Sequence, residues 1–284
     1  ICRLRFRCGK EESVMLFDFL KKRKAEAFDP AVLLCNQPNF FAAEAYKLLR
    51  TNIMFTLPDE GKCRVIGVSS ATRGEGKSTT SVNLSYVIAE MGKRVLLIDG
   101  DLRLPSVAKK LGIPSEPGLS DALMTAESDF SGIVKTQKEN WDILPAGSIP
   151  PNPSELLGSA QMSAFIQRLA ENYDFIIVDL PPVTVVSDAL ALSPILNGIV
   201  LVVRNNYSKR RELHLALKSL ELAGSKVLGI VVNGKKVKKY TITLKTDKGK
   251  AIKKAKVTIK VKGKTYKAKT NSKGKATFKL KKLT

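Results

Sequence analysis

Five short apolar runs divide the central part of the chain. They cover residues 64–69, 94–99, 174–179, 199–204 and 226–233, and each is rich in Val, Ile and Leu. Apolar residues follow one another in these runs instead of alternating with polar ones, which is typical of strands that are buried on both faces. The pattern therefore predicts five strands of a mostly parallel sheet.

Stretches with helical character lie between these runs. They cover residues 77–91, 159–172, 187–196 and 210–223, and glycine follows the first and the last of them, as it commonly does at the end of a helix. Alternating strands and helices predict an α/β fold in which helices sandwich the sheet. Because such sheets bind ligands at the carboxyl ends of their strands, the polar residues that close the runs are the first candidates for chemistry.

A glycine-rich segment follows the first run and opens the first helical stretch. Residues 71–79 read ATRGEGKST and fit the P-loop pattern A/G-x4-G-K-S/T. In such a loop the backbone N–H groups face phosphate oxygens, Lys77 would reach the terminal phosphates, and the Ser78 hydroxyl would bind Mg²⁺. The nucleotide-binding residues predicted in this segment are Gly74, Glu75, Gly76, Lys77, Ser78 and Thr79.

The next two strand ends carry carboxylates. Asp99 and Asp101 close the second run, with Arg103 two residues further on, and Asp179 closes the third run in the Walker B arrangement. Neighbouring carboxylates repel one another unless a cation or a proton lies between them, so Mg²⁺ is a natural partner, although a solvated acidic loop would have the same pattern. Together, the three strand ends predict a site for a nucleoside triphosphate.

In order and spacing, these motifs resemble those of the bacterial tyrosine kinases of capsule and exopolysaccharide synthesis. That family is a branch of the P-loop ATPases that also includes the MinD and ParA partitioning proteins. The resemblance covers roughly residues 30–234 and includes the segments around Glu44, Ser187 and Asn233. It implies a P-loop α/β fold and an ATP-dependent protein-tyrosine kinase that phosphorylates itself.

The resemblance also implies a role for each motif residue. Lys77 would hold the β- and γ-phosphates of ATP, and Asn233 would lie near the adenine. Asp99 would be the general base for the tyrosine hydroxyl. Arg103 would orient the two carboxylates of Asp99 and Asp101. Because a tyrosine hydroxyl titrates near about 10, most of the catalysis must come from positioning and from cationic charge on the phosphoryl group. The residues implied to hold Mg²⁺ are Ser78, Asp101 and Asp179.

A helix ahead of the P-loop carries Glu44, Lys47 and Arg50 in the spacing of the family's ExxRxxR motif, which helps subunits assemble into rings. We therefore expect a homo-oligomeric ring, in which Lys47 lacks the bidentate fork of the family's arginine. The segment also fits an amphipathic helix that buries its apolar residues and leaves its charges in solvent. Those apolar residues are Phe41, Ala45, Leu48 and Leu49.

The resemblance further implies partners and a location. A membrane-embedded polysaccharide co-polymerase would activate the kinase through its cytoplasmic segment, and the kinase would be cytoplasmic and peripheral at the inner face of the plasma membrane. No run of about 18 apolar residues predicts a membrane span, and the start of the chain lacks the apolar stretch of a signal peptide. The family's terminal tyrosine cluster is missing, because the six tyrosines are scattered, so the substrate tyrosines stay open.

Charge is concentrated at the two ends of the chain. The net charge of +22 over 284 residues divides into +4 for residues 1–28, −1 for residues 29–234, and +19 for residues 235–284, which hold 20 Lys and one Asp. The basicity thus lies outside the predicted catalytic block, and a solvated lysine face is favoured over binding to an anionic membrane or, least of all, to nucleic acid. The predicted units are a basic arm at 1–30, of which 1–14 has features of a foreign segment, a kinase domain at 31–234, and a lysine-rich β segment at 235–284.

The lysine-rich segment has a strand pattern of its own. Apolar residues alternate with Lys or Thr over residues 240–244, 257–261, 266–268 and 276–280, and turn residues lie between these groups. The alternation predicts four antiparallel strands. They resemble part of an Ig-like or transthyretin-like repeat of surface proteins, which carries no functional residues over to this chain.

The cysteines carry no clear chemistry. Cys2, Cys8, Cys35 and Cys63 form no CxxC pair, and the only histidine is His214. We expect free thiols in a reducing compartment, with a disulfide or a metal site as the alternative.

Two functions fit the sequence. The first is the ATP-dependent protein-tyrosine kinase, which the DxDxR and DxPP motifs at Asp99 and Asp179 favour. The alternative is a MinD/ParA-type switch, in which nucleotide-dependent dimerisation on a membrane or on DNA carries the signal. The missing tyrosine cluster and the lysine-rich tail slightly favour that alternative.

Overall fold

The computed structural model describes residues 33–36, 40–57, 61–125, 132–234, 238–243, 254, 256–261, 264–273 and 275–280. The predicted basic arm and Cys2 and Cys8 lie outside the described residues. Cys35 and Cys63 are free thiols, as predicted. In the part of the chain that is described, no helix combines the length and apolarity needed to cross a membrane.

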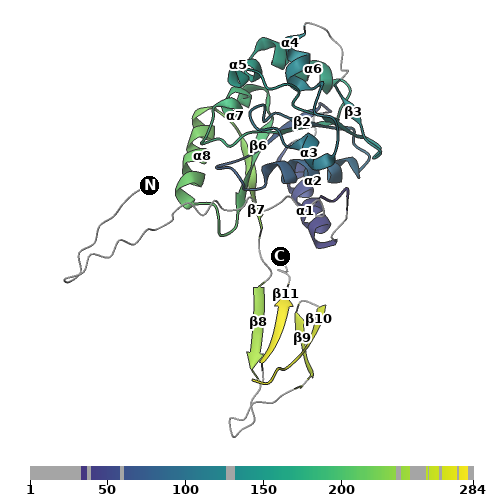
Figure 1. Cartoon of the computed structure of the whole chain (residues 1–284), viewed down its shortest axis with the longest axis vertical. Helices are drawn as coiled ribbons and strands as arrows, with labels where there is room; N and C mark the ends of the chain where they lie inside the picture. Colours follow the sequence, from purple (N-terminus) through teal and green to yellow (C-terminus); the bar gives the residue numbers. More distant parts are fainter. Residues whose placement is uncertain are drawn as a thin grey trace, which may run out of the picture.

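A seven-stranded sheet forms the centre of the helix-covered part of the molecule (Figure 1). Its strands lie in the order β3-β4-β2-β5-β1-β6-β7, and all neighbours are parallel except β3, which pairs with β4 in the antiparallel sense. The strands are β1 (Arg64–Ser70), β2 (Val95–Asp99), β3 (Val134–Lys135), β4 (Trp141–Leu144), β5 (Phe175–Asp179), β6 (Gly198–Arg204) and β7 (Val227–Asn233).

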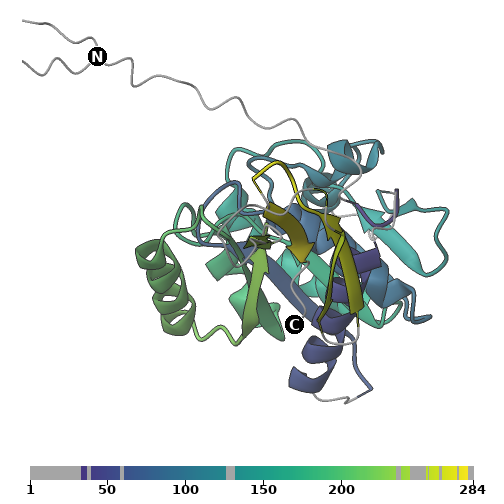
Figure 2. The same cartoon turned by 90° about the horizontal axis from the view of Figure 1, so that it is seen from below.

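Helices cover both faces of this sheet (Figures 1 and 2). One apolar core lies between the sheet and α1 and α2, and the other lies between the sheet and α4 to α8. The predicted mostly parallel α/β sandwich is therefore confirmed. The helices are α1 (Phe40–Thr56), α2 (Lys77–Ala89), α3 (Val107–Leu111), α4 (Leu119–Met124), α5 (Pro153–Leu157), α6 (Ala160–Ala170), α7 (Asp188–Ala191), the 3-10 turn η2 (Ser193–Ile195) and α8 (Arg210–Leu222).

Strand register brings the predicted site together. In the sheet order, β5 lies between β2 and β1, so the three strand ends singled out by sequence are neighbours. Asp99 at the end of β2 pairs with Asp179 at the end of β5, and Asp179 pairs with Val68 of β1, just ahead of the P-loop. The central helix α2 then begins at Lys77 and packs on these same strands through a face that is buried over most of its length.

The packing of α1 differs from the prediction. The expected buried residues included Ala45 and Leu48, but both are exposed, Leu48 at 51%. The helix instead buries Ile53 and packs through Ala42, Ala43, Tyr46 and Leu49, because this stripe faces α2. Of the predicted apolar face only Leu49 lies on the packed side, and the side chain of Phe41 lies outside the described residues.

The lysine-rich segment forms four antiparallel strands, as predicted. They pair in two separate two-stranded sheets, β9 with β10 and β8 with β11, neither of which joins the seven-stranded sheet. The strands are β8 (Lys238–Thr243), β9 (Lys256–Val261), β10 (Lys264–Lys269) and β11 (Lys275–Leu280).

Candidate active site

The P-loop connects β1 to α2 and takes a conformation that requires glycine at two places. Gly74 and Gly76 have φ angles of 80° and 97°, in the left-handed region that side chains disfavour. A Cβ atom at Gly76 would lie 2.0 Å from Nδ2 of Asn233. The backbone therefore lies close to Asn233 and turns directly into the N-terminus of α2, where N–H groups lack helical partners and favour an anion.

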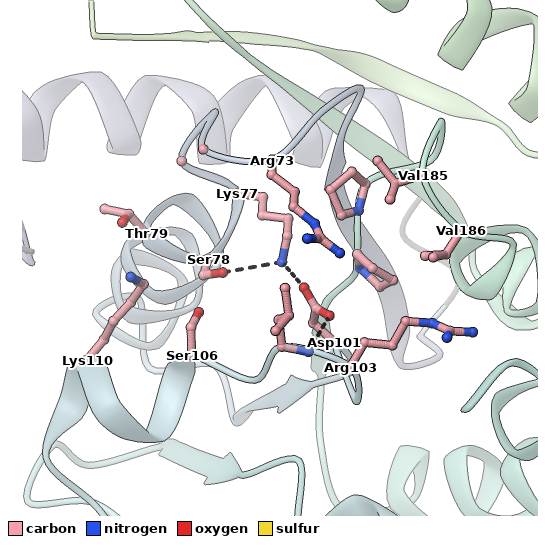
Figure 3. Close-up of a pocket in the computed structure, with 15 residues that line it drawn as sticks. Arg73, Lys77, Ser78, Thr79, Asp101, Arg103, Ser106, Lys110, Val185 and Val186 are labelled. Atoms are coloured by element: carbon pink, nitrogen blue, oxygen red, sulfur yellow. Dashed lines mark hydrogen bonds and ion pairs between the residues drawn. The ribbon is translucent and has the colours of Figure 1, made fainter. Parts of the chain in front are cut away.

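Lys77 is the charged centre of the site. Figure 3 shows its side chain reaching between Ser78 and Asp101. Its Nζ lies 2.7 Å from Oδ2 of Asp101, 3.6 Å from Oδ2 of Asp179 and 3.5 Å from Oγ of Ser78. Burial favours the neutral amine, but the charges of Asp179 and Asp101 outweigh burial, so the pKa of Lys77 is raised and the ammonium is kept.

Asp179 has one oxygen with no hydrogen-bond donor. The side chain is fully buried, and Oδ1 accepts a hydrogen bond from Oγ of Ser81 at 3.0 Å. Oδ2 has no hydrogen-bond partner within the described residues and lies 3.6 Å from the Lys77 ammonium. Burial raises the pKa of Asp179, and an unpartnered buried carboxylate oxygen is costly unless a cation or donor reaches it.

This arrangement fits a magnesium ion bound together with a nucleotide. Mg²⁺ is typically held by one or two carboxylates and by phosphate oxygens and water, so Ser78, Asp101 and the free oxygen of Asp179 would suit it. Across the described ranges, no group of three or more His, Cys, Asp and Glu side chains is placed to hold a metal ion. Phosphate oxygens of the nucleotide and water would supply the remaining ligands.

Asp99 lies beneath the pocket and does not line it. Its side chain is fully buried, and Oδ2 accepts hydrogen bonds from the backbone N–H groups of Ser106 and Val107, both at 2.9 Å. These bonds tie the end of β2 to the start of α3. Burial, assisted by the charge of Asp179, raises the pKa of Asp99 to about 7. Asp101, by contrast, lines the pocket directly.

The family resemblance implies that Arg103 orients Asp99 and Asp101, but its hydrogen bonds go to other residues. Its Nε and Nη2 donate to the two carboxylate oxygens of Asp188, at 2.9 and 3.0 Å, and Nη2 also donates to Oγ of Ser154 at 3.0 Å. Asp188 is fully buried at the start of α7, so it attracts the nearest guanidinium, while Lys77 already partners Asp101. The bidentate pair fixes the exit of β2 to α5 and α7.

Four side chains brace the P-loop from the carboxyl ends of β6 and β7, and we call them the P-loop clamp. Tyr207 donates its hydroxyl to the carbonyl of Arg73 at 3.1 Å, and Arg204 donates to the carbonyl of Gly74 at 3.3 Å. The guanidinium of Arg204 also stacks over the Tyr207 ring, 5.4 Å from its centroid. The four members are Arg204, Tyr207, Ser208 and Asn233.

The other two clamp residues act on Glu75. Ser208 donates to the Glu75 carboxylate, whose second oxygen accepts from the N–H of Thr72 at 3.0 Å. Asn233 donates to the Glu75 carbonyl at 3.0 Å. Neither Glu75 nor Asn233 lines the pocket, so both side chains shape the P-loop backbone. The sequence analysis did not identify Arg204, Tyr207 or Ser208 as site residues. Arg204 could have been found, because it closes β6 and ligands bind at the carboxyl ends of such strands.

The pocket itself has a volume of about 330 Å³ and opens between the P-loop, the exit of β2 and the exit of β5. Of the predicted site residues, it is lined by Gly74, Gly76, Lys77, Ser78, Thr79, Asp101 and Arg103. The pocket brings a glycine-rich N–H cradle, an ammonium and a carboxylate to one place, with the free oxygen of Asp179 behind them. That combination can bind phosphates and stabilise charge that is moving between them.

The predicted oligomerisation residues of α1 divide into two groups. Glu44 is exposed and Lys47 is half-buried, and the two form a salt bridge with one another at 3.3 Å. Arg50 donates instead to the carbonyl of Val87, near the end of α2, at 2.5 Å. Arg50 thus bonds within its own subunit, whereas the Glu44–Lys47 pair lies at the surface of α1.

Comparison with known proteins identifies the family. Residues 63–210 match the family model described as an AAA domain. The chain is 36% identical to the tyrosine-protein kinase YwqD of Bacillus subtilis over 222 residues, which is 78% of this chain and 93% of that protein.

Solved structures show the same relationship. The kinase domain of the Escherichia coli tyrosine kinase ETK is similar with a TM-score of 0.67 and 30% identity, over 76% of this chain and 83% of that one. The septum site-determining protein MinD of Pyrococcus horikoshii, solved with Mg-ADP, is similar with a TM-score of 0.51 and 29% identity, over 60% of this chain and 70% of that one. The chain therefore belongs to the family of bacterial tyrosine-protein kinases, a branch of the P-loop ATPases related to MinD.

Proposed function

We propose that the protein is an ATP-dependent protein-tyrosine kinase that phosphorylates itself and acts in capsule or exopolysaccharide synthesis. The observation that carries the proposal is the Lys77 ammonium, which lies between Asp101 and Asp179 at the foot of the P-loop pocket. Its relatives named tyrosine-protein kinases support this reading. The similar MinD structure with bound Mg-ADP supports ATP and Mg²⁺ as the cofactors.

In this proposal, the P-loop and Lys77 bind the β- and γ-phosphates, which draws the ammonium away from Asp101. Ser78, Asp179 and Asp101 hold Mg²⁺, which supplies positive charge to the phosphates. The tyrosine hydroxyl oxygen forms a bond to the γ-phosphorus, the bond from that phosphorus to the β–γ bridging oxygen breaks, and ADP leaves with the electron pair.

The hydroxyl proton needs a carboxylate acceptor. We keep Asp99 as the general base that the family resemblance implies, and its raised pKa, about 7, suits proton transfer near neutral pH. Asp101 is the alternative, because it lines the pocket whereas Asp99 lies beneath it with its oxygens bonded to backbone N–H groups. Asp99→Asn and Asp101→Asn, compared at several pH values, separate the two assignments.

The proposal includes partners and a place in the cell. We place the protein in the cytoplasm, at the inner face of the plasma membrane, with the cytoplasmic segment of a membrane-embedded polysaccharide co-polymerase as its activator. Subunits form a homo-oligomeric ring through Glu44 and Lys47, while Arg50 acts within its own subunit. The substrates are protein tyrosines.

Phosphotyrosine formation tests the proposal. The purified chain, incubated with ATP and Mg²⁺, is expected to gain phosphotyrosine on itself or on a supplied tyrosine-rich peptide, and Lys77→Met is expected to lose at least about 100-fold in rate, because it removes a charge that stabilises the transferring phosphoryl group. Lys109→Met serves as a matched control, since Lys109 is an exposed lysine of α3 that does not line the pocket.

A MinD-type ATPase switch is the second candidate, because the MinD fold is similar. ATP hydrolysis without any phosphotyrosine, even with the peptide and an activator segment present, would favour that switch and would rule out the kinase.

A further inference from the structure

The pocket has two unlike walls. One is the P-loop, which offers N–H groups, hydroxyls and cations for phosphate. The other is apolar and comes from the exits of β2 and β5. The residues of this apolar wall are Leu104, Pro181, Pro182, Val185 and Val186.

Two side chains of the apolar wall are open to solvent. Leu104 is 54% exposed and Val185 is 46% exposed. Single exposed apolar residues are ordinary on a protein surface. These two, however, line one cavity together with Lys77 and Asp101, where solvated polar groups would otherwise be expected. An apolar surface beside a charged cavity gains free energy only when an apolar group of a ligand covers it.

The backbone that carries this wall is firmly held. The N–H of Leu104 donates to Oδ1 of Asp101 at 3.1 Å, so Leu104 is tied to the acid that lines the pocket. The N–H of Val183 donates to the carbonyl of Ser70 at 2.9 Å, and the Thr184 hydroxyl donates to the carbonyl of Ala71 at 2.5 Å. The part of the wall that follows β5 is therefore anchored to the end of β1, Leu104 is anchored to Asp101, and the wall does not have to be ordered by a ligand.

The position of the wall identifies the part of the reaction that it serves. Leu104 closely follows Asp101 and Val185 closely follows Asp179 in sequence, so both lie on the acidic side of Lys77. Figure 3 shows Val185 and Val186 across the pocket from Thr79 and Lys110. Phosphates need the donors of the P-loop wall, so an apolar group on the acidic side would belong to the molecule that receives the phosphoryl group.

We propose that Leu104 and Val185 hold the aromatic ring of the substrate tyrosine and thereby select tyrosine over serine and threonine. This inference rests on the proposed kinase function and specifies its acceptor site. A phenol ring has an apolar body and a polar tip, so it can cover both side chains while its hydroxyl reaches towards Asp101 and Lys77. Serine carries its hydroxyl directly on Cβ and has no ring to contact the wall.

Peptide binding tests the inference directly. The probe is a fluorescein-labelled peptide with one central tyrosine among alanine and glutamate residues, titrated with the full chain in the presence of Mg²⁺ and a non-hydrolysable ATP analogue. The Leu104→Ala and Val185→Ala variants are each expected to weaken peptide binding about tenfold, because each removes apolar surface that the ring would cover. Leu104→Met is expected to restore binding. Leu215→Ala, which removes a similarly exposed leucine from α8, is expected to bind as the wild type does.

The same titration has outcomes that overturn the inference. Unchanged peptide affinity in both alanine variants would show that the ring does not contact the wall. A loss of affinity for the ATP analogue itself would assign the wall to the nucleotide, and equal binding of a peptide with serine in place of tyrosine would remove the selectivity. Because binding is read without turnover, the two failures can be told apart: a chain that never forms phosphotyrosine, but whose peptide binding falls in both alanine variants, would contradict the kinase function and keep only the contact between the tyrosine ring and the wall.

Discussion

At the scale of single residues, the P-loop depends on side chains that never touch the nucleotide pocket. The clamp residues Tyr207 and Arg204 hold the carbonyls of Arg73 and Gly74. Those carbonyls must point away from the pocket for the N–H groups to face phosphate oxygens. A hydrogen bond on the outer side of the loop therefore helps to orient the N–H groups on its inner side. We expect the loss of that bond to lower the affinity for nucleotide.

Tyr207→Phe tests this coupling. The variant loses one hydrogen bond, to the Arg73 carbonyl, and keeps the ring that stacks under Arg204. We expect affinity for Mg-ADP to fall about threefold to tenfold, the range of a single neutral hydrogen bond, and calorimetric titration measures it. Tyr173→Phe is the matched control. Tyr173 lies just ahead of β5, and its hydroxyl donates to Asp142 of β4, far from the carboxyl ends of the strands. Equal ADP affinity in Tyr207→Phe and the wild type would contradict the clamp.

Sequence predicts those residues of the site that lie at the carboxyl ends of strands. It does not predict contacts between residues that are far apart along the chain. Lys77, Asp101 and Asp179 come together because neighbouring parallel strands end at one edge. The partner of Arg103 could not be predicted in this way, since Asp188 lies 85 residues further on and is brought near by α7. A guanidinium two residues after an acid is placed by tertiary contacts and not by sequence proximity.

At the scale of elements, long apolar runs were predictable and short pieces were not. The five predicted strands and four predicted helical stretches match β1, β2, β5, β6 and β7 and α2, α6, α7 with η2, and α8 within a few residues. The two-residue β3 and the five- and six-residue helices α3, α4 and α5 are too short to show a period. The prediction of the buried face of α1 was wrong because the side of the helix that packs depends on the position of α2, which the sequence does not give.

Arg50→Met tests the place of α1 within its own subunit. The hydrogen bond from Arg50 satisfies the carbonyl of Val87 in the last turn of α2, where helical partners are missing. Its loss should cost about 1–2 kcal/mol and lower the melting temperature by about 2–8 °C for a domain of this size. Lys47→Met, three residues earlier at the surface of α1, should leave the melting temperature within about 1 °C. An Arg50→Met variant that melts at the temperature of the wild type would contradict this role of Arg50 within its own subunit.

At the scale of the whole molecule, charge and catalysis are separate. The three strand ends that build the pocket lie in a segment with a net charge of −1, whereas residues 235–284 carry +19. Sequence located that division because composition changes abruptly, and the four antiparallel strands followed from the alternation of apolar and polar residues. The arrangement of these strands as two separate pairs could not be predicted. Alternation shows which residues share a face of a strand, but it does not show which strand pairs with which.

The proposed boundary near residue 235 leads to a test on the whole chain. Truncation after Gly234 leaves the seven-stranded sheet with all of its strands, since β7 closes it and β8 to β11 pair only among themselves. We therefore expect the truncated protein to bind Mg-ADP within about twofold of the full chain and to melt within about 2 °C of it. Cation-exchange retention should fall sharply, because 20 lysines are removed. Loss of ADP binding, or a truncated chain that fails to fold, would mean that the lysine-rich strands stabilise the kinase fold, and the boundary at residue 235 would then not separate two independent units.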